Sequence, residues 1–181
     1  MATLQEIIDR AQAAAGGYDA DISLEAMLWP LIRDLYGEKA GNVDERWKVL
    51  KTHPLSLSNG FATLPSTVMT KFMSSAVVSD STDETTADLM SWKANWQDYV
   101  SNLSSMLGYF TLHPDGKFYA RLPGVTYTDS LSASPVLNVT TASMPDVPAD
   151  EDDEMDINSE LVDEIVMRLA AAIRPAPAPS S

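Results

Sequence analysis

The hydrophobic period changes several times along this chain of 181 residues, and these changes restrict the fold classes open to it. Near both ends, apolar residues recur every three or four positions, which is the period of an amphipathic helix. In the middle, apolar and small residues alternate around turn sequences, as in β-strands. The chain is therefore predicted to have an α+β fold, in which amphipathic helices accompany β-hairpins that form a small antiparallel sheet.

Four helices are expected before the C-terminal region. A capping box and an apolar repeat predict a short helix over residues 3–16. A second helix is predicted over 23–37, with Pro30 expected to kink it or divide it, because proline lacks a backbone donor. A brief third helix is expected over 42–50, and a Trp-rich fourth over 87–107.

A docked helix is predicted near the C-terminus. Asn158 or Asp156 can cap it, and acidic residues near its start and arginines near its end suit the helix dipole. Its apolar stripe consists of Ile157, Leu161, Ile165, Leu169 and Ile173. The sequence Pro-Ala-Pro-Ala-Pro-Ser-Ser that follows cannot be helical, so residues 174–181 are expected to form an extended or disordered tail.

The strand signals lie between residues 55 and 140. Asn59-Gly60 predicts a hairpin within 55–64, and a His-Pro-Asp-Gly turn predicts a second hairpin that pairs 109–112 with 117–122. The remaining expectations are a strand ending at Val78, an acidic loop over 80–88, a strand over 136–140 and a Pro- and acid-rich linker over 144–156. The predicted organisation is an N-terminal helix or arm (1–20), a single α+β domain (21–173) and the tail.

The charge balance limits the possible partners. The formal net charge is -14, and residues 146–181 contain 10 acids but only 2 bases. Because the Lys and Arg residues are scattered singly, we expect no sequence-specific DNA binding, although an acidic wall would let DNA pass without adhering. The chain has no cysteine, its N-terminal sequence does not resemble a signal peptide, and no stretch is apolar enough to span a bilayer. Residence in a membrane or secretion is therefore not expected.

Residues suited to catalysis are few. The only histidines, His53 and His113, both precede proline, so both are expected at surface turns, and they lack zinc-ligand spacing. The acidic run 150–156 lacks the glycine and glutamate positions of a calcium loop, and no Gly-rich phosphate cradle is present. No catalytic, cofactor-binding or metal-binding residue is predicted, and we expect no enzyme. A hydrolase that uses carboxylates is the weakest alternative.

An aromatic strip admits two interpretations. Trp92, Trp96 and Tyr99 share one face of the predicted helix over 87–107. Such a strip can be a platform on which a partner or a nucleic-acid base stacks, but at helical spacing it is more often part of the core. On either interpretation it marks where this segment is anchored.

The order of these segments resembles that of tailed-phage head–tail connector (neck ring, adaptor) proteins of podovirus-like and crAss-like phages. The resemblance covers roughly residues 21–173. It begins with a helical segment, DISLEAMLWPLIRDLYG, and continues through the Leu-Pro step in GFATLPSTVMTKF to the hairpin YFTLHPDGKFYARLPG. A strand, SPVLNVTTAS, and the closing helix, DINSELVDEIVMRLAAAI, complete the succession.

This resemblance implies a non-catalytic virion protein, made in the host cytoplasm, that forms a ring of usually about twelve copies. Such a ring joins the portal protein to tail or other neck proteins and surrounds the DNA channel, with non-specific passage of DNA. The alternative is a soluble protein–protein adaptor module outside any virion.

Overall fold

The computed structural model describes residues 2–17, 23–101, 106–124 and 135–174, which form two compact units. The helical unit combines Met1–Val49 with Met144–Ser181, and the β unit is Leu50–Ser143. The prediction of a single domain over 21–173 with residues 1–20 as an arm stays a prediction, and it divides the chain at other positions. The N-terminal helix packs against the C-terminal helix, and no local pattern can reveal a contact between segments so far apart in sequence.

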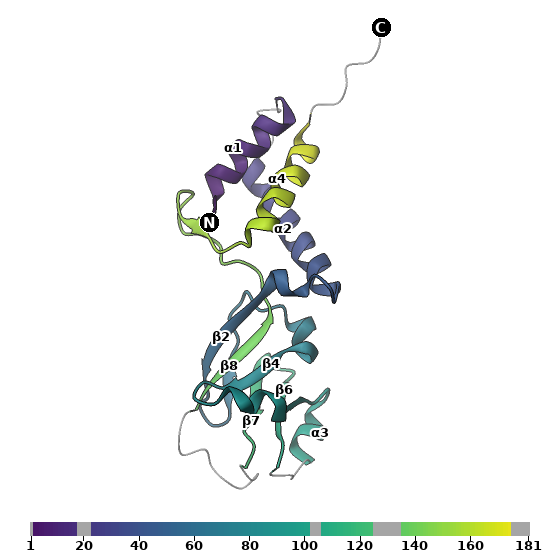
Figure 1. The fold of residues 1–181 in the computed structure, drawn as a ribbon, viewed down its shortest axis with the longest axis vertical. Coiled ribbons are helices and arrows are strands. Elements are labelled where there is room, and N and C mark those ends of the chain that lie inside the picture. The colour runs from purple at the N-terminus through teal and green to yellow at the C-terminus, as the bar shows by residue number, and fades with distance from the viewer. Residues whose placement is uncertain (1, 18–22, 102–105, 125–134, 175–181) are drawn as a thin grey trace. The chain divides into compact units, whose positions relative to one another are not determined.

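Three helices make up most of the helical unit (Figure 1). They are α1 (Leu4–Ala15), α2 (Leu24–Gly41) and α4 (Ser159–Ile173), and α4 packs against both of the others. A 3-10 helix, η1 (Arg46–Val49), follows α2. The strands β1 (Ala2–Thr3) and β9 (Glu154–Met155) pair antiparallel beside the helices. The strand β9 lies in the segment predicted as a linker, because a strand of two residues has no detectable period.

Local cap signals place the helix starts correctly. The Thr3 hydroxyl accepts a hydrogen bond from the backbone N–H of Glu6 at 3.1 Å. The side-chain oxygen of Asn158 accepts one from the backbone N–H of Glu160 at 3.0 Å. At the end of α1, Gly16 has a φ of 73°, a left-handed conformation that glycine adopts without strain. Pro30 does not divide α2, which is one continuous helix that includes this residue and ends at Gly41, beyond the expected Gly37.

The predicted stripe of α4 forms the core of the helical unit. All five of its residues are buried, together with Ile7 and Ala11 of α1 and Leu28 and Ile32 of α2. Full burial of one such aliphatic side chain contributes about 1.5–3 kcal/mol. The stripe therefore supplies much of the free energy that joins the two ends of the chain into one unit.

The β unit contains two sheets. The three-stranded sheet has the order β2 (Leu50–Ser56), β8 (Val136–Ala142) and β4 (Val77–Asp80), with antiparallel neighbours. The four-stranded sheet has the order β3 (Phe61–Thr63), β7 (Lys117–Arg121), β6 (Gly108–Leu112) and β5 (Met90–Trp92). The strands β5 and β6 are parallel and the other neighbours are antiparallel. The unit also contains η2 (Thr70–Ser75), η3 (Glu84–Leu89) within the expected acidic loop, and α3 (Trp96–Ser101).

One hydrophobic cluster forms the core of the β unit. Its members include Leu55, Leu57, Met73, Phe110, Phe118, Leu137 and Val139. They come from both sheets and from η2, so the cluster joins elements that are distant in sequence. The α+β class and the largely antiparallel sheets agree with the prediction.

The first predicted hairpin is wrong beyond its turn. Asn59 and Gly60 both have positive φ, at 54° and 81°, and Ser58 and Phe61 exchange backbone hydrogen bonds across them. The flanking strands then separate, since β2 pairs with β8 whereas β3 pairs with β7. The turn therefore carries the chain from one sheet to the other. Turn chemistry is local, but the choice of strand partner depends on burial in the whole unit.

The later predictions for the β unit have mixed outcomes. The second hairpin is confirmed as β6 and β7, and the strand over 136–140 is confirmed as β8. The long helix over 87–107 is wrong in its first part, where Met90–Trp92 is a strand. Helical structure begins only at Trp96, because the Asn95 side chain accepts the N–H of Asp98 at 2.8 Å. Residues 102–105 of that segment, and residues 175–181 of the predicted tail, lie outside the described residues.

The brief helix expected over 42–50 is present only as the 3-10 turn η1. Within the described ranges, no helix combines the length and the apolar character needed to cross a membrane.

The buried stripe of α4 yields a first prediction. We expect Ile165→Asp to destabilise the helical unit by about 3–5 kcal/mol, because a fully buried position would receive an unpaired charge. Met167→Asp is the matched control, since Met167 lies in the same helix and is 63% exposed. The loss of stability caused by Met167→Asp should stay within about 1 kcal/mol. Thermal melts of both variants, followed by circular dichroism, measure the difference, and equal melting temperatures would contradict burial of the stripe.

A second prediction concerns the close packing at Gly108. A Cβ atom at this position would lie 2.1 Å from the Met90 sulfur and 2.8 Å from the Arg121 carbonyl oxygen. Gly108→Ala should therefore destabilise the β unit by about 1–3 kcal/mol. Gly41→Ala, at the end of α2, meets nothing within 4 Å and should be neutral or stabilise by up to about 1 kcal/mol. Urea unfolding of the two variants tests this difference in sign.

Candidate functional site

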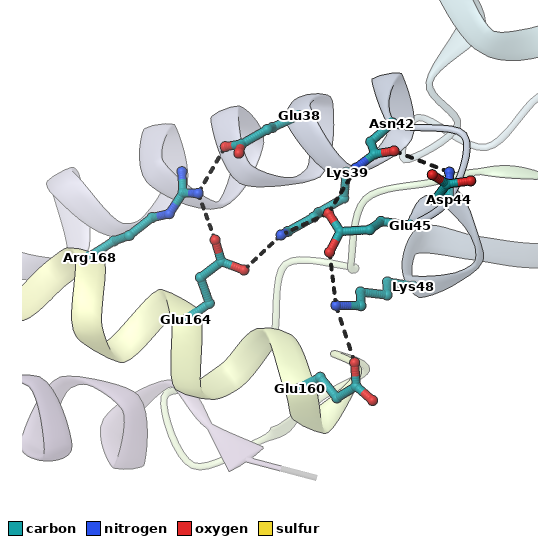
Figure 2. A network of polar contacts seen from close by, with 9 residues as sticks. All are labelled: Glu38, Lys39, Asn42, Asp44, Glu45, Lys48, Glu160, Glu164 and Arg168. Atoms are coloured by element: carbon teal, nitrogen blue, oxygen red, sulfur yellow. Dashed lines mark hydrogen bonds and ion pairs between the residues drawn. The ribbon is translucent and has the colours of Figure 1, made fainter.

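The segment that follows α2 is held by a chain of ion pairs (Figure 2). The Lys39 ammonium lies 3.1 Å from a carboxylate oxygen of Glu45 and 3.1 Å from one of Glu164. Lys48 continues the chain at 3.3 Å from Glu45 and 3.2 Å from Glu160. The network thereby ties α2 and the segment over residues 42–49 to α4.

A second branch of the network joins the last turn of α2 to α4. The Arg168 guanidinium lies 2.8 Å from Glu38 and 2.6 Å from Glu164, so Glu164 contacts two cations. Charges of opposite sign alternate along the network from Glu38 to Glu160. A connected network orders its side chains at a lower entropic cost per contact than isolated surface pairs.

Hydrogen bonds also fix the backbone of residues 42–49, which we call the anchor segment. The Asn42 side chain accepts the N–H of Asp44 at 3.1 Å and donates to Glu45 at 3.3 Å. The Arg46 guanidinium donates to the carbonyl oxygen of Ala40 at 2.9 Å, at the end of α2 where that carbonyl has no intrahelical partner. This segment is therefore ordered although it contains only a single 3-10 turn.

The network favours the charged form of each group whose pKa is shifted. Hydrogen bonds that the Lys39 ammonium donates to Glu45 and Glu164 raise the pKa of Lys39, whose side chain is only 10% exposed. Hydrogen bonds with Lys39 and Lys48 lower the pKa of Glu45. Partial burial would raise the pKa of Glu164, but its bonds to Lys39 and Arg168 outweigh that effect and lower it. The arrangement stabilises an ionic contact and does not poise a group for proton transfer near neutral pH.

The anchor segment presents apolar side chains to solvent. Val43 is 75% exposed and Trp47 is 54% exposed, one helical turn apart in sequence. The Lys48 ammonium lies 5.8 Å from the centre of the Trp47 ring. Both residues lie in the segment predicted as a brief helix over 42–50, of which only η1 forms. An exposed tryptophan on an ordered backbone has the properties of an interface anchor.

The two histidines are less exposed than expected. His113 does precede the β6–β7 turn, where its Nδ1 lies 2.9 Å from an Asp115 oxygen. His53 instead lies within β2, partly buried, with Nε2 2.8 Å from the Ser143 hydroxyl. Residues 90 positions apart thus form a His–Ser contact that no sequence motif indicated.

The geometry of the His53–Ser143 contact does not favour nucleophilic catalysis. Ser143 is fully buried, and its hydroxyl donates to the carbonyl oxygen of Thr141 at 3.3 Å. Which of the two atoms donates depends on the imidazole tautomer, but the buried hydroxyl is closed to a substrate in either case. This bond ties β2 to the chain just after β8.

The remaining sequence candidates are distributed as follows. In the acidic run, Asp150 donates its backbone N–H to Asp153 at 3.1 Å, and Glu154 and Met155 form β9. Among the residues that the structure describes, no three His, Asp or Glu side chains are grouped so as to hold a metal ion. The aromatic strip is divided: Trp92 packs against the β-unit core, whereas Trp96 and Tyr99 lie on α3.

The chain matches no protein-family model, and none of the curated proteins is significantly similar to it.

The network yields a third prediction, on stability and pH. Lys39→Met should lower the melting temperature at neutral pH more than Arg10→Met does, because Lys39 is buried between two carboxylates. The Arg10–Asp163 pair is largely exposed and should contribute little. Thermal melts from about pH 7 to about pH 3 measure the difference.

The expected pH dependence has a definite sign. The pKa values of Glu45 and Glu164 are lowered in the folded state, so both carboxylates stabilise the fold. This stabilisation is complete above the ordinary glutamate pKa of 4.5 and is lost as the pH falls through the pKa values of the folded state. The wild-type melting temperature should therefore fall more steeply on acidification than that of Lys39→Met. Parallel curves would show that the network does not stabilise the fold.

Proposed function

We propose that this chain is a structural subunit of a tailed-phage head–tail connector, a neck or adaptor ring that joins the portal to the tail and lines the DNA channel. The observation that carries the proposal is the anchor segment, where Val43 and Trp47 are exposed on a backbone fixed by hydrogen bonds and ion pairs. The succession of sequence segments that resembles connector proteins supplies the specific class.

A rigid exposed anchor suits permanent assembly. Tryptophan is prominent among the residues that dominate the energetics of protein interfaces. Because the network through Lys39 and Lys48 already orders the anchor segment, little further entropy is lost when a partner covers it. Ring subunits associate through two different complementary surfaces, and a preformed apolar anchor can supply one of them.

The distribution of charge also supports a channel-lining role. The helical unit contains 19 of the 26 acidic residues but 7 of the 12 basic ones, so its net charge is -12 and that of the β unit is -2. Copies of the helical unit arranged around a channel would repel the phosphate backbone of DNA. Repulsion keeps a duplex in transit from adhering to the wall.

The same anchor segment would also serve a soluble adaptor that binds one protein partner outside a virion. The two functions differ in location and copy number. A neck ring requires a fixed number of chains for each particle, whereas an adaptor does not co-purify with particles.

The fourth prediction tests this distinction. In virus particles purified from a lysate that produces this chain, quantitative mass spectrometry should find about twelve copies for each tail. The double variant Val43→Ala, Trp47→Ala should be absent from particles or strongly depleted, although its melting temperature stays close to that of the wild type.

Val147→Ala is the matched control for that variant. Val147 is 70% exposed and lies in the same unit but outside the anchor segment, so its removal should leave incorporation unchanged. Particles that lack the wild-type chain altogether would refute the connector role. Incorporation of the double variant at wild-type level would refute the role of the anchor segment.

A further inference from the structure

A second surface, on the β unit, is built from aromatic rings. We define the aromatic cluster as Phe61, Trp96, Tyr99, His113 and Tyr119, contributed by β3, α3, the β6–β7 turn and β7. The Trp96 ring is central: it stacks on Tyr99 at 5.3 Å and meets Tyr119 edge-on at 4.8 Å and His113 edge-on at 4.7 Å. The Phe61 and Tyr119 rings are 5.4 Å apart.

The strand register shows that the aromatic cluster lies on the sheet face away from the core. Phe61 is paired with Tyr119, whereas the neighbouring pair of Ala62 and Phe118 belongs to the buried cluster. Successive residues of a strand point to opposite faces, so Phe61 and Tyr119 point outward. Except for the buried Tyr99, the members of the cluster remain partly exposed.

We propose that the aromatic cluster binds the Pro-Ala-Pro-Ala-Pro sequence, residues 175–179, of a second copy of this chain. Proline-rich segments populate the polyproline II conformation before binding, so little entropy is lost when they dock. Grooves lined by tryptophan and tyrosine recognise such segments by packing proline rings against aromatic rings. This inference deepens the proposed function by naming a contact between subunits.

Charge complementarity supports this occupant. Arg174 immediately precedes the first proline, and two exposed carboxylates belong to the segments that form the aromatic cluster: Asp98 is on the same short helix as Trp96, and Asp115 lies beside His113. Two cations lie over rings of the cluster, with Lys117 4.6 Å from Phe61 and Arg121 5.8 Å from Tyr99, and Lys117 is also 3.6 Å from Asp115. In the proposed contact, the guanidinium of Arg174 interacts with these carboxylates.

The tail and the aromatic cluster belong to different units of the chain. The tail follows directly on α4, which ends at Ile173 in the helical unit, whereas the aromatic cluster belongs to the β unit. A segment of seven residues in the polyproline II conformation spans about 22 Å. When the tail of one copy binds the aromatic cluster of the next, the two copies are in head-to-tail contact. Repeated contacts of this kind close into a ring if the rotation between successive copies is a whole fraction of a full turn.

The fifth prediction uses the full chain and a labelled peptide. An acetylated, fluorescent peptide with the sequence of residues 174–181, RPAPAPSS, should bind the full chain, as measured by fluorescence anisotropy. A peptide of equal charge in which glycine replaces each proline should fail to compete. We expect Trp96→Ala to weaken binding at least about tenfold and the exposed-site variant Asp98→Lys to weaken it roughly threefold.

Val77→Ala, a change at an exposed position of the other sheet, should bind the peptide as the wild type does. If Trp96→Ala unfolds, the outcome with Asp98→Lys decides. The inference is overturned if the peptide does not bind the folded full chain, if the glycine peptide competes equally, or if Asp98→Lys binds with unchanged affinity. Peptide binding by a chain that is absent from virus particles would leave this inference standing and refute the connector role alone.

Discussion

The packing of α4 against α1 and α2 is the contact on which the helical unit depends. The five aliphatic residues of its stripe are buried. They belong to the last part of the chain, and they complete a core whose other members lie within the first fifty residues. Neither α1 nor α2 can bury its apolar face without it. The ion pairs of Lys39, Lys48 and Arg168 lie along the same contact, so they add specificity to an association that burial drives.

In the β unit, a single strand has the corresponding role. The strand β8 lies between β2 and β4, so both edge strands depend on it for their ladder hydrogen bonds. Pro54 lies within β2, where its missing N–H is tolerated because one side of the strand has no partner among the described strands. The chain then crosses at Asn59-Gly60 into the second sheet, and one hydrophobic cluster joins the two sheets.

The functional surfaces follow from this construction. Each unit has a core supplied by segments distant in sequence, and each leaves a set of large side chains outside that core on ordered backbone. In the helical unit this set is Val43 and Trp47, and in the β unit it is the aromatic cluster around Trp96. Surfaces of this kind are the ones that the connector proposal assigns to contacts between proteins, and in that proposal the acidic helical unit faces DNA.

Sequence alone determined the features that depend on neighbours along the chain: the cap at Thr3, the buried stripe of α4, the β6–β7 hairpin and the turn at Asn59-Gly60. These follow from backbone geometry and from periods of a few residues. Tertiary structure decided the remainder. It separated β2 from β3, made a strand of the segment around Trp92, exposed Trp47 and brought His53 to Ser143. Each of these features depends on which distant segment buries more apolar surface against the residue or strand concerned. The local sequence pattern contains no information on that segment.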